Sequence, residues 1–475
     1  MTCCIQSPNR KPGFLAWVIS AFASLAFAAT PATMRLDYFH TGGKGQEIFS
    51  VDRIVIEPLP WPGNPNRPID STNRGTYFFE VRDLASKRLL YSRGFSSIYG
   101  EWITTGEAKE VSRTFHESLR FPAPASPIEI VVKKRDPQNS FREIWTTTLD
   151  PHDKSIDTSP PALSPTVIAI EKHGDTAVKL DLLFLGEGYT AGERGKCEKD
   201  IRRLTKGVFS YSPFKERRSD FNVWAICAAS PDSGVSHPAS GIHKNTLYGT
   251  QFDVFGEDRY ALSFNNRAIR NMASFAPYDA MGIVMNSNQY GNGGIFGLYA
   301  TVSIDYPTGI QTFVHEFGHH IADLGDEYYF NPNVAYSPAD TKVEPWEPNI
   351  TALLDPHHLK WQSMIEPGTP IPTPWPKDCY EDSLRDSQKS VDRMRAENRP
   401  ASDVEEARRQ AREKAEHCMS TGPYADKVGA FEGAMYETRG YYRPQQQCIM
   451  ISGDQFCAVC RHAIEEIIDM YSATR

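Results

Sequence analysis

The sequence predicts a mixed α+β protein, with an N-terminal all-β sandwich over residues 29–150 and an α/β domain over residues 166–475. Three observations support this fold class. Short runs of β-branched and aromatic residues, separated by turn-forming clusters, fill the first region. Residues 151–165 are rich in proline and indicate a linker. Strand and helix patterns then alternate, as they do around a sheet that is covered by helices.

The composition is typical of a globular protein. The chain has 475 residues, enough for two or three separate cores, and 34 of them are prolines, which favours many ordered loops. Its formal net charge is −8, with 51 basic against 59 acidic residues, and no basic face stands out. We therefore expect no nucleic acid among its partners.

Residues 1–28 have the composition of an export signal. A basic pair precedes an apolar stretch from Phe14 to Phe27, and Ala28 completes an Ala-Phe-Ala cleavage motif. The apolar stretch is shorter than the roughly 20 residues that a membrane-spanning helix needs, so a retained anchor is the less favoured alternative. We expect cleavage near Ala28 and a mature protein that is secreted or periplasmic and free of the membrane.

The N-terminal region has five predicted strands and no constellation of chemically reactive side chains. A structural role and a role in docking substrate or glycan are equally compatible with it. The strand patterns cover Ile54–Ile56, Thr76–Val81, Leu89–Ser92, Ile128–Val132 and Ile144–Thr148.

The second region alternates strands and helices and ends in a helix near Ala458–Tyr471. Charged, helix-forming residues at about 380–418, bracketed by Cys379 and Cys418, indicate a surface insertion that a disulfide could close. The one helix predicted before the glycine-rich segment is Ala191–Phe209. The predicted strands are Leu180–Leu185, Phe221–Ala229, Met281–Asn286 and Leu298–Ile304.

A glycine-rich segment, which includes Gly293 and Gly294, precedes the last of these strands. Glycine allows close backbone approach, so an edge strand here could bind an extended peptide substrate by main-chain hydrogen bonds. An ordinary bulged turn is the alternative. A phosphate-binding loop is disfavoured, because the GxxxxGK[ST] pattern is absent.

The stretch from Thr312 to Tyr329 contains an HExxH motif. On a helix, His315 and His319 lie one turn apart on one face, where both imidazoles can bind a single metal ion. Zinc is the expected metal, and Glu316 is placed to act as the general base for a metal-activated water. The alternative is a buried helix whose histidines are satisfied by hydrogen bonds.

The third ligand must lie beyond the helix. Gly325 can adopt a left-handed conformation there and turn the chain back, which brings either Asp326 or Glu327 to the ion. We favour Asp326, and Glu327 then has a structural role. His320 points about 100° away from the histidine pair and is expected to be packed or solvated.

Seven cysteines remain after removal of the signal, so at least one is unpaired within a monomer. The pair Cys457 and Cys460, with Cys448 nearby, suggests either a structural zinc site or disulfides. We favour disulfides, because no second pair at matching spacing accompanies the first.

The chain resembles the bacterial IgA-cleaving zinc metallopeptidase family, a metzincin-like group of secreted enzymes with its own N-terminal β-domain. The resemblance covers nearly the whole mature chain and implies a metzincin-like α/β catalytic domain over residues 166–475. The motifs that carry it are Trp102–Ala108, Phe115–Arg120, Phe184–Tyr189, Ser230–Val235, His315–His319 with Asp326–Tyr328, Tyr442–Pro444 and Cys448–Cys460.

The resemblance implies zinc on His315, His319 and Asp326, with Glu316 as base and proton shuttle. It also implies that Met450 lies in the turn beneath the ion. One departure stands out: the usual third-ligand position of metzincins falls on Gly325, so Asp326 requires a shift of one residue.

These features predict a secreted zinc endopeptidase that acts on proteins or peptides, with immunoglobulin or glycoprotein substrates as candidates. A Tyr or Arg in the segment Tyr436–Arg443 could stabilise the oxyanion, with Tyr442 as the first candidate; a packed aromatic ring is the alternative. Two other functions stay open. The protein could be a secreted glycan- or protein-binding protein with a structural metal, or a zinc hydrolase of a non-protein amide.

Overall fold

The fold is described from a computed structural model, which covers residues 1–4, 30–43, 45–162, 164–329, 343–397 and 399–472. The predicted signal sequence and its cleavage site lie almost entirely outside these ranges. Residues Pro31–Arg475 form one compact unit, separate from Met1–Thr30, and all that follows concerns the larger unit. Among the described residues, no helix is both long enough and apolar enough to cross a membrane.

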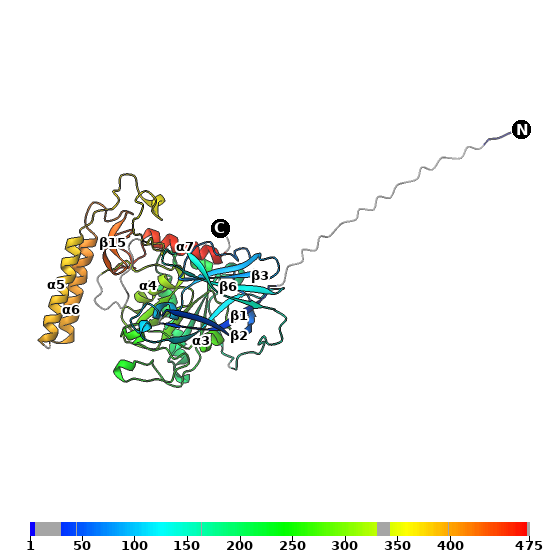
Figure 1. Cartoon of the computed structure of the whole chain (residues 1–475), viewed down its shortest axis with the longest axis horizontal. Coiled ribbons are helices and arrows are strands. Elements are labelled where there is room, and N and C mark those ends of the chain that lie inside the picture. The colour runs from blue at the N-terminus through cyan, green and yellow to red at the C-terminus, as the bar shows by residue number, and fades with distance from the viewer. Residues whose placement is uncertain (5–29, 44, 163, 330–342, 398, 473–475) are drawn as a thin grey trace. The chain divides into compact units, whose positions relative to one another are not determined.

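Two antiparallel sheets make up the N-terminal region (Figure 1). Alternate side chains of both sheets meet in one core, including Leu36, Phe79 and Leu119, as the period of two in strands requires. The three-stranded sheet has the order β2 (Gln46–Pro60), β1 (Ala32–Gly43), β5 (Arg113–Pro122). The four-stranded sheet has the order β4 (Leu89–Phe95), β3 (Tyr77–Asp83), β6 (Ile128–Arg135), β7 (Phe141–Leu149).

Strands β1 and β5 were not among the predicted strands, because charged residues interrupt their apolar pattern. Arg35 of β1 is buried and donates to Asp37 at 2.9 Å, to Glu57 at 3.0 Å and to Asn271 at 2.8 Å. Asn271 belongs to the α/β region, so these buried polar groups satisfy one another across the contact between the two regions.

A six-stranded mixed sheet forms the centre of the second region. Its four inner strands are parallel and both edge strands are antiparallel. Strand β9 is buried along its whole length, as expected for a central strand with both faces covered. The order is β12 (Asn292–Ile295), β13 (Tyr299–Ser303), β11 (Ala280–Met285), β9 (Leu180–Glu187), β10 (Phe221–Ile226), β8 (Val167–Glu171).

The two faces of this sheet have different cover. Helices α2 (Arg194–Val208), α4 (Gly309–Ala322) and α7 (Ala458–Tyr471) share a core with one face. Helix α3 (Asn266–Ala273) and the N-terminal sheets share a second core with the other face. The predicted succession of N-terminal β-sheets and a mixed sheet with helices is therefore confirmed.

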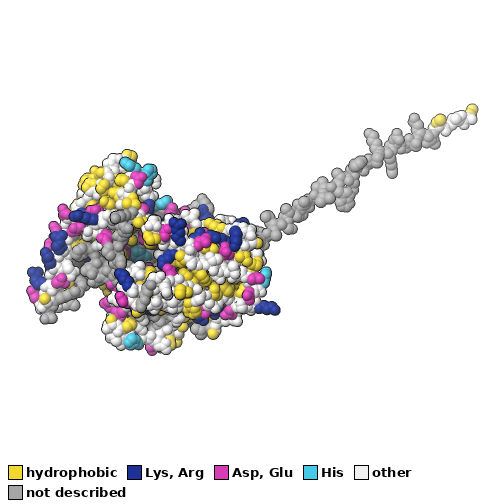
Figure 2. Space-filling view, in the orientation of Figure 1, with side chains coloured by type: hydrophobic (Ala, Val, Ile, Leu, Met, Phe, Trp, Pro, Cys, Tyr) yellow, Lys and Arg dark blue, Asp and Glu magenta, His cyan; other side chains and the backbone are white. Residues whose placement is uncertain are grey.

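The charged segment forms a hairpin of two helices, α5 (Lys377–Ala396) and α6 (Ala401–Met419), which Figure 1 shows in yellow and orange. A disulfide between Cys379 and Cys418 closes it, as the sequence suggested. Side chains of both charges lie on its surface (Figure 2). A second disulfide, Cys197–Cys227, ties α2 to the end of β10.

The remaining elements are short. Strands β14 (Phe431–Ala434) and β15 (Glu437–Arg443) form a hairpin, and α1 (Ile98–Trp102) follows β4. Short 3₁₀ helices occupy Glu107–Lys109, Thr176–Val178, Ala191–Glu193, Arg218–Asp220, Pro238–Ser240, Val254–Gly256 and Gln362–Met364.

Candidate metal centre

Helix α4 carries the HExxH motif and has one apolar face. Phe313, Val314 and Phe317 are fully buried against the six-stranded sheet and α7, which fixes the helix in the core. The side chains of His315 and His319 lie on the other face and retain 16% and 19% of their exposure. The sequence therefore presents both imidazoles at the edge of the core and within reach of solvent.

Asp326 completes a compact group with the two histidines. The two Nε2 atoms are 3.2 Å apart, and Oδ1 of Asp326 lies 3.2 Å from Nε2 of His315 and 3.3 Å from Nε2 of His319. Three ligand atoms at roughly 2.0–2.1 Å from a tetrahedral ion would be separated by roughly 3.3 Å. The triangle of His315, His319 and Asp326, called the triad below, therefore has the dimensions that a zinc ion requires.

Backbone carbonyl groups fix both rings. Nδ1 of His315 lies 2.9 Å from the carbonyl oxygen of Ile449, and Nδ1 of His319 lies 2.5 Å from that of Leu324. A carbonyl can only accept, so each Nδ1 carries the proton and each Nε2 directs a lone pair at the centre of the triad. Three acceptors that face one another need a cation or protons between them.

The charges in the triad also favour a bound cation. Burial alone would lower the pKa of His319, but the Asp326 carboxylate raises it to about 10. Burial would raise the pKa of Asp326, but the two histidines hold it well below its ordinary value. In the absence of a metal the triad therefore binds a proton strongly, which is the behaviour of a site built for positive charge.

The turn that follows α4 differs from the prediction. The left-handed residue is Asp323, with a φ of 51°, and Gly325 is not among the residues with positive φ. Aspartate tolerates this conformation, and its side chain accepts a hydrogen bond from the backbone of Gly75 at 2.6 Å. Gly325 is instead required by packing, because a Cβ atom there would lie 2.8 Å from Ile350.

Asp326 and Glu327 point in opposite directions, as neighbours in extended backbone do. Asp326 faces the histidines. The Oε1 atom of Glu327 accepts from Nδ2 of Asn349 at 2.9 Å and lies 3.2 Å from the sulfur of Cys460. The structure thus brings Asp326, and not Glu327, to the histidine pair.

Glu316 and His315 open onto one pocket. Its other lining residues come from five segments of the chain: Arg259, Tyr290, Asn292, Thr308, Gln311, Thr312, Tyr328, Ile449, Ile451, Ser452 and Gly453. Arg259 interacts electrostatically with Tyr328, Tyr290 and Glu316. Arg259 was not predicted, since it lies in no motif with a defined spacing, and Tyr328 appeared only as the end of the motif Asp326–Tyr328, with no role assigned.

Tyr436, at the tip of the β14–β15 hairpin, reaches the triad. Its hydroxyl donates a short hydrogen bond to Oδ2 of Asp326. Met435 and Tyr436 both have positive φ, at 51° and 67°, a conformation that costs of order 1–3 kcal/mol for such residues. Backbone bonds from Met435 to Asp326 and from Tyr436 to Tyr328 hold this strained tip in place.

Tyr442 lies away from the triad. It sits on β15, where its backbone pairs with Thr351 and Glu432, and its half-buried ring packs against the core that contains α4. It is not among the residues that line the pocket of His315 and Glu316. Of the segment singled out in the sequence, Tyr436 is the residue that contacts the triad.

The two glycines of β12 lie beside α4. A Cβ atom on Gly294 would lie 2.1 Å from the carbonyl oxygen of Glu316, and one on Gly293 would lie 2.7 Å from the ring of Tyr260. The strand is an edge strand as predicted, but the backbone of Asn292 is already bonded to the segment Arg259–Ala261. The observed role of Gly294 is close packing of the strand onto the helix.

His320 belongs to α4, and Met450 packs against the same helix. His320 is buried: its Nδ1 donates to the carbonyl of Ile295 at 2.9 Å and its Nε2 accepts from the backbone of Met281 at 3.1 Å. Burial lowers its pKa to about 4, so it is a neutral core residue. Met450 is buried against the helix at Gly318, where a Cβ would lie 3.2 Å from its sulfur.

Two models of known protein families match the chain. The family described as IgA Peptidase M64 matches residues 168–468, which includes every residue of the triad and its pocket. The family described as Peptidase M64 N-terminus matches residues 26–146, the region of the two antiparallel sheets. No curated protein matches the chain.

Proposed function

The chain belongs to the IgA peptidase M64 family, and on this premise we propose that it is a zinc-dependent endopeptidase with a metzincin-like catalytic domain. Membership of the family implies peptidase activity and a protein substrate. The observation that carries the zinc assignment is the triad, whose three inward-facing atoms are 3.2–3.3 Å apart and whose His315 lines the same pocket as Glu316.

His315, His319 and Asp326 would hold the metal. When bound, zinc lowers the pKa of a water molecule towards neutrality and polarises a carbonyl group. Glu316 follows the first histidine and lines the pocket, where it can accept the proton of the attacking water and deliver it to the leaving amine. The carbonyl groups of Ile449 and Leu324 keep the two imidazoles in the tautomer that this arrangement needs.

Oxyanion stabilisation is assigned to the hydroxyl of Tyr436, in preference to Tyr442. Tyr436 is already hydrogen-bonded to Asp326, so its hydroxyl lies at the edge of the triad where negative charge develops on the substrate carbonyl. Arg259, in the same pocket and within electrostatic reach of Glu316, would bind a carbonyl or carboxylate of the substrate chain.

We place the enzyme outside the cytoplasm. Two disulfides, Cys197–Cys227 and Cys379–Cys418, support this location, because such bonds persist in oxidising compartments, and the sequence of residues 1–28 is that of an export signal. The substrates proposed are proteins, with immunoglobulins and other glycoproteins to be tested first.

The experiment uses the purified chain, casein and a panel of secreted host proteins, with and without a chelator. We expect cleavage that the chelator abolishes and added zinc restores. Cleavage that the chelator leaves unchanged would contradict the proposed mechanism. A protein that binds panel members without cutting them would support a binding function with a structural metal, and cleavage of only small amides would support a non-protein hydrolase.

A further inference from the structure

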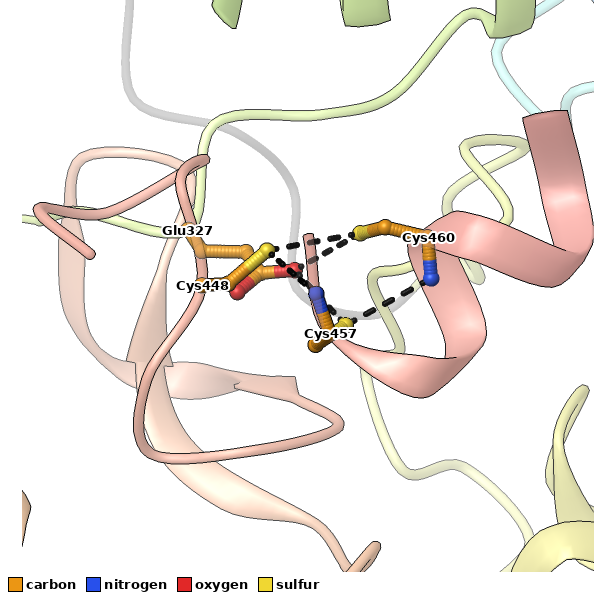
Figure 3. Close-up of side chains that lie close together, drawn as sticks. All are labelled: Glu327, Cys448, Cys457 and Cys460. Atoms are coloured by element: carbon orange, nitrogen blue, oxygen red, sulfur yellow. Dashed lines mark hydrogen bonds between the residues drawn. The ribbon is translucent and has the colours of Figure 1, made fainter. Parts of the chain in front are cut away.

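Three cysteines and one carboxylate lie together behind the triad. Glu327, Cys448 and Cys460 are fully buried, and Cys457 retains 4% of its exposure. One ligand atom from each lies within 4.8 Å of all the others. Figure 3 shows the four side chains converging, Cys457 and Cys460 from the first turn of α7 and Glu327 and Cys448 from two separate loops.

The separations of these atoms match a tetrahedral metal site. At about 2.3 Å from zinc to sulfur and about 2.0 Å to oxygen, two sulfurs would lie roughly 3.8 Å apart and a sulfur and an oxygen roughly 3.5 Å apart. Here the sulfurs of Cys448 and Cys460 are 3.7 Å apart. The Oε1 atom of Glu327 lies 3.2 Å from the sulfur of Cys460 and 3.9 Å from that of Cys457.

Disulfides, which the sequence analysis favoured for these cysteines, do not form here. All three thiols are free, whereas Cys197–Cys227 and Cys379–Cys418 are disulfide-bonded. A disulfide could join only two of the three cysteines and would leave the third thiol unpaired and the buried carboxylate of Glu327 without a directly bonded cation. The Oε2 atom of Glu327 has no hydrogen-bond partner, which is costly for a buried charge unless a cation is bound.

Backbone N–H groups face two of the three sulfurs. The backbone N–H of Cys457 points to the sulfur of Cys448 at 3.3 Å, and that of Cys460 to the sulfur of Cys457 at 3.4 Å. Cys457 caps the N-terminus of α7, where the helix dipole stabilises negative charge. The buried guanidinium of Arg443 lies within electrostatic reach of Glu327 and Cys448, and Asn349 orients the carboxylate.

We propose that Glu327, Cys448, Cys457 and Cys460 bind a second metal ion, of the zinc class, in a closed structural site. Thiolate ligands select a soft or borderline ion, and four protein ligands with almost no exposure leave no position for water or substrate. This site is distinct from the triad in ligands and in role, and goes beyond the peptidase activity.

The second site connects the two segments that complete the triad. Glu327 follows Asp326 in the chain, and Cys448 precedes Ile449, whose carbonyl accepts the hydrogen bond of His315. A further bond joins the same segments, from the backbone N–H of Glu327 to the carbonyl of Met450 at 2.9 Å. An ion bound by both segments would fix the positions of Asp326 and of His315 at once.

Metal analysis and cobalt spectroscopy test the proposal on the full chain. We expect about two zinc ions per wild-type chain, and about one in Cys457→Ser and in His319→Ala. Cobalt bound by thiolates gives intense sulfur-to-metal charge-transfer absorption, which histidine and carboxylate ligands do not give. This absorption should be present in wild type and in His319→Ala and absent in Cys457→Ser, whose remaining ion should bind about 10–100-fold more weakly.

A second measurement on the wild-type chain keeps the proposal testable if Cys457→Ser does not fold. Alkylation of the denatured, chelated but unreduced protein, followed by peptide mapping, should label Cys448, Cys457 and Cys460 and leave the four disulfide cysteines unlabelled. A disulfide among the three, one zinc per wild-type chain, or cobalt without thiolate absorption would each overturn the second site. None of these outcomes would contradict the proposed role of Glu316 as general base in peptide hydrolysis.

Discussion

The Nδ1 atom of His315 lies 2.9 Å from the carbonyl oxygen of Ile449, a residue 134 positions further along the chain. This hydrogen bond sets both the tautomer and the orientation of the first imidazole of the triad. Ile449 lies between Cys448 and Met450, in the segment that also contacts Glu327. The C-terminal part of the chain therefore controls the geometry of a motif that occupies a single helix.

Asp326→Asn should lower the affinity of the triad for zinc by at least about 100-fold, because it removes the negative charge of the triad's only anionic ligand. Glu327→Gln changes the neighbouring carboxylate, a ligand of the second site, and should weaken zinc binding at the triad only indirectly, by about 10–100-fold as in Cys457→Ser. Competition with a chromogenic chelator measures both affinities. Loss of the triad's metal in Glu327→Gln together with its retention in Asp326→Asn would reverse the ligand assignment.

Tyr436→Phe should reduce kcat by about 10²–10³-fold and change KM little, because it removes one hydroxyl that would stabilise the oxyanion. Tyr442→Phe removes the hydroxyl of a tyrosine on the same hairpin that lies outside the pocket, and should reduce kcat less than about 2-fold. Steady-state kinetics on one peptide substrate compares them. Equal losses in the two variants would exclude a special role for Tyr436.

Gly294→Ala should destabilise the protein by about 1–3 kcal/mol, because its Cβ would lie 2.1 Å from the carbonyl oxygen of Glu316 and would push β12 away from α4. Gly192→Ala is the control, since nothing lies within 4 Å of a Cβ at that position. Urea unfolding gives the change for each. An unchanged free energy of unfolding in Gly294→Ala would show that the strand does not pack on the helix as described.

Glu347 makes stability depend on pH. Burial, followed by the charge of Asp323, raises the pKa of this carboxyl from 4.5 to about 7. The folded protein therefore holds a proton on Glu347 that the unfolded chain has lost between about pH 4.5 and 7, and stability falls as the pH rises through this window. The full shift corresponds to about 3 kcal/mol lost by pH 8.

Glu347→Gln should therefore raise the free energy of unfolding by up to about 3 kcal/mol at pH 8 and leave it nearly unchanged at pH 4.5. Glu366→Gln removes an equal charge from a side chain that is 63% exposed and should have little effect at either pH. Chemical unfolding at both pH values provides the comparison. A gain that is the same at pH 4.5 and pH 8 would refute the raised pKa.

Local patterns were sufficient to predict the elements with strong periodicity. The helix predicted near Ala458–Tyr471 is α7, and the apolar spacing around His315 correctly indicated the helix that presents both imidazoles. Strands β9 and β11 were recognised as continuous apolar runs. In each case the residues that determine the element lie within it.

What could not be predicted depends on contacts between distant residues. The sequence favoured Asp326 over Glu327 as the third ligand but could not decide between them, since the choice depends on the backbone turn at Asp323. Three thiols can form a disulfide or bind a metal, and only the approach of Glu327, more than a hundred residues before Cys448, favours the metal. Within the segment Tyr436–Arg443, the sequence gives no reason to prefer Tyr436 as the residue that contacts the triad, because its position depends on the strained tip of the hairpin.

The most direct test of the peptidase mechanism is the turnover of Glu316→Gln, measured on a cleaved peptide alongside the metal content of the same preparation. We expect kcat to fall by about 10²–10⁴-fold while the metal content and the unfolding midpoint stay at wild-type values. A variant that keeps wild-type turnover with its metal intact would contradict the assignment of Glu316 as the general base.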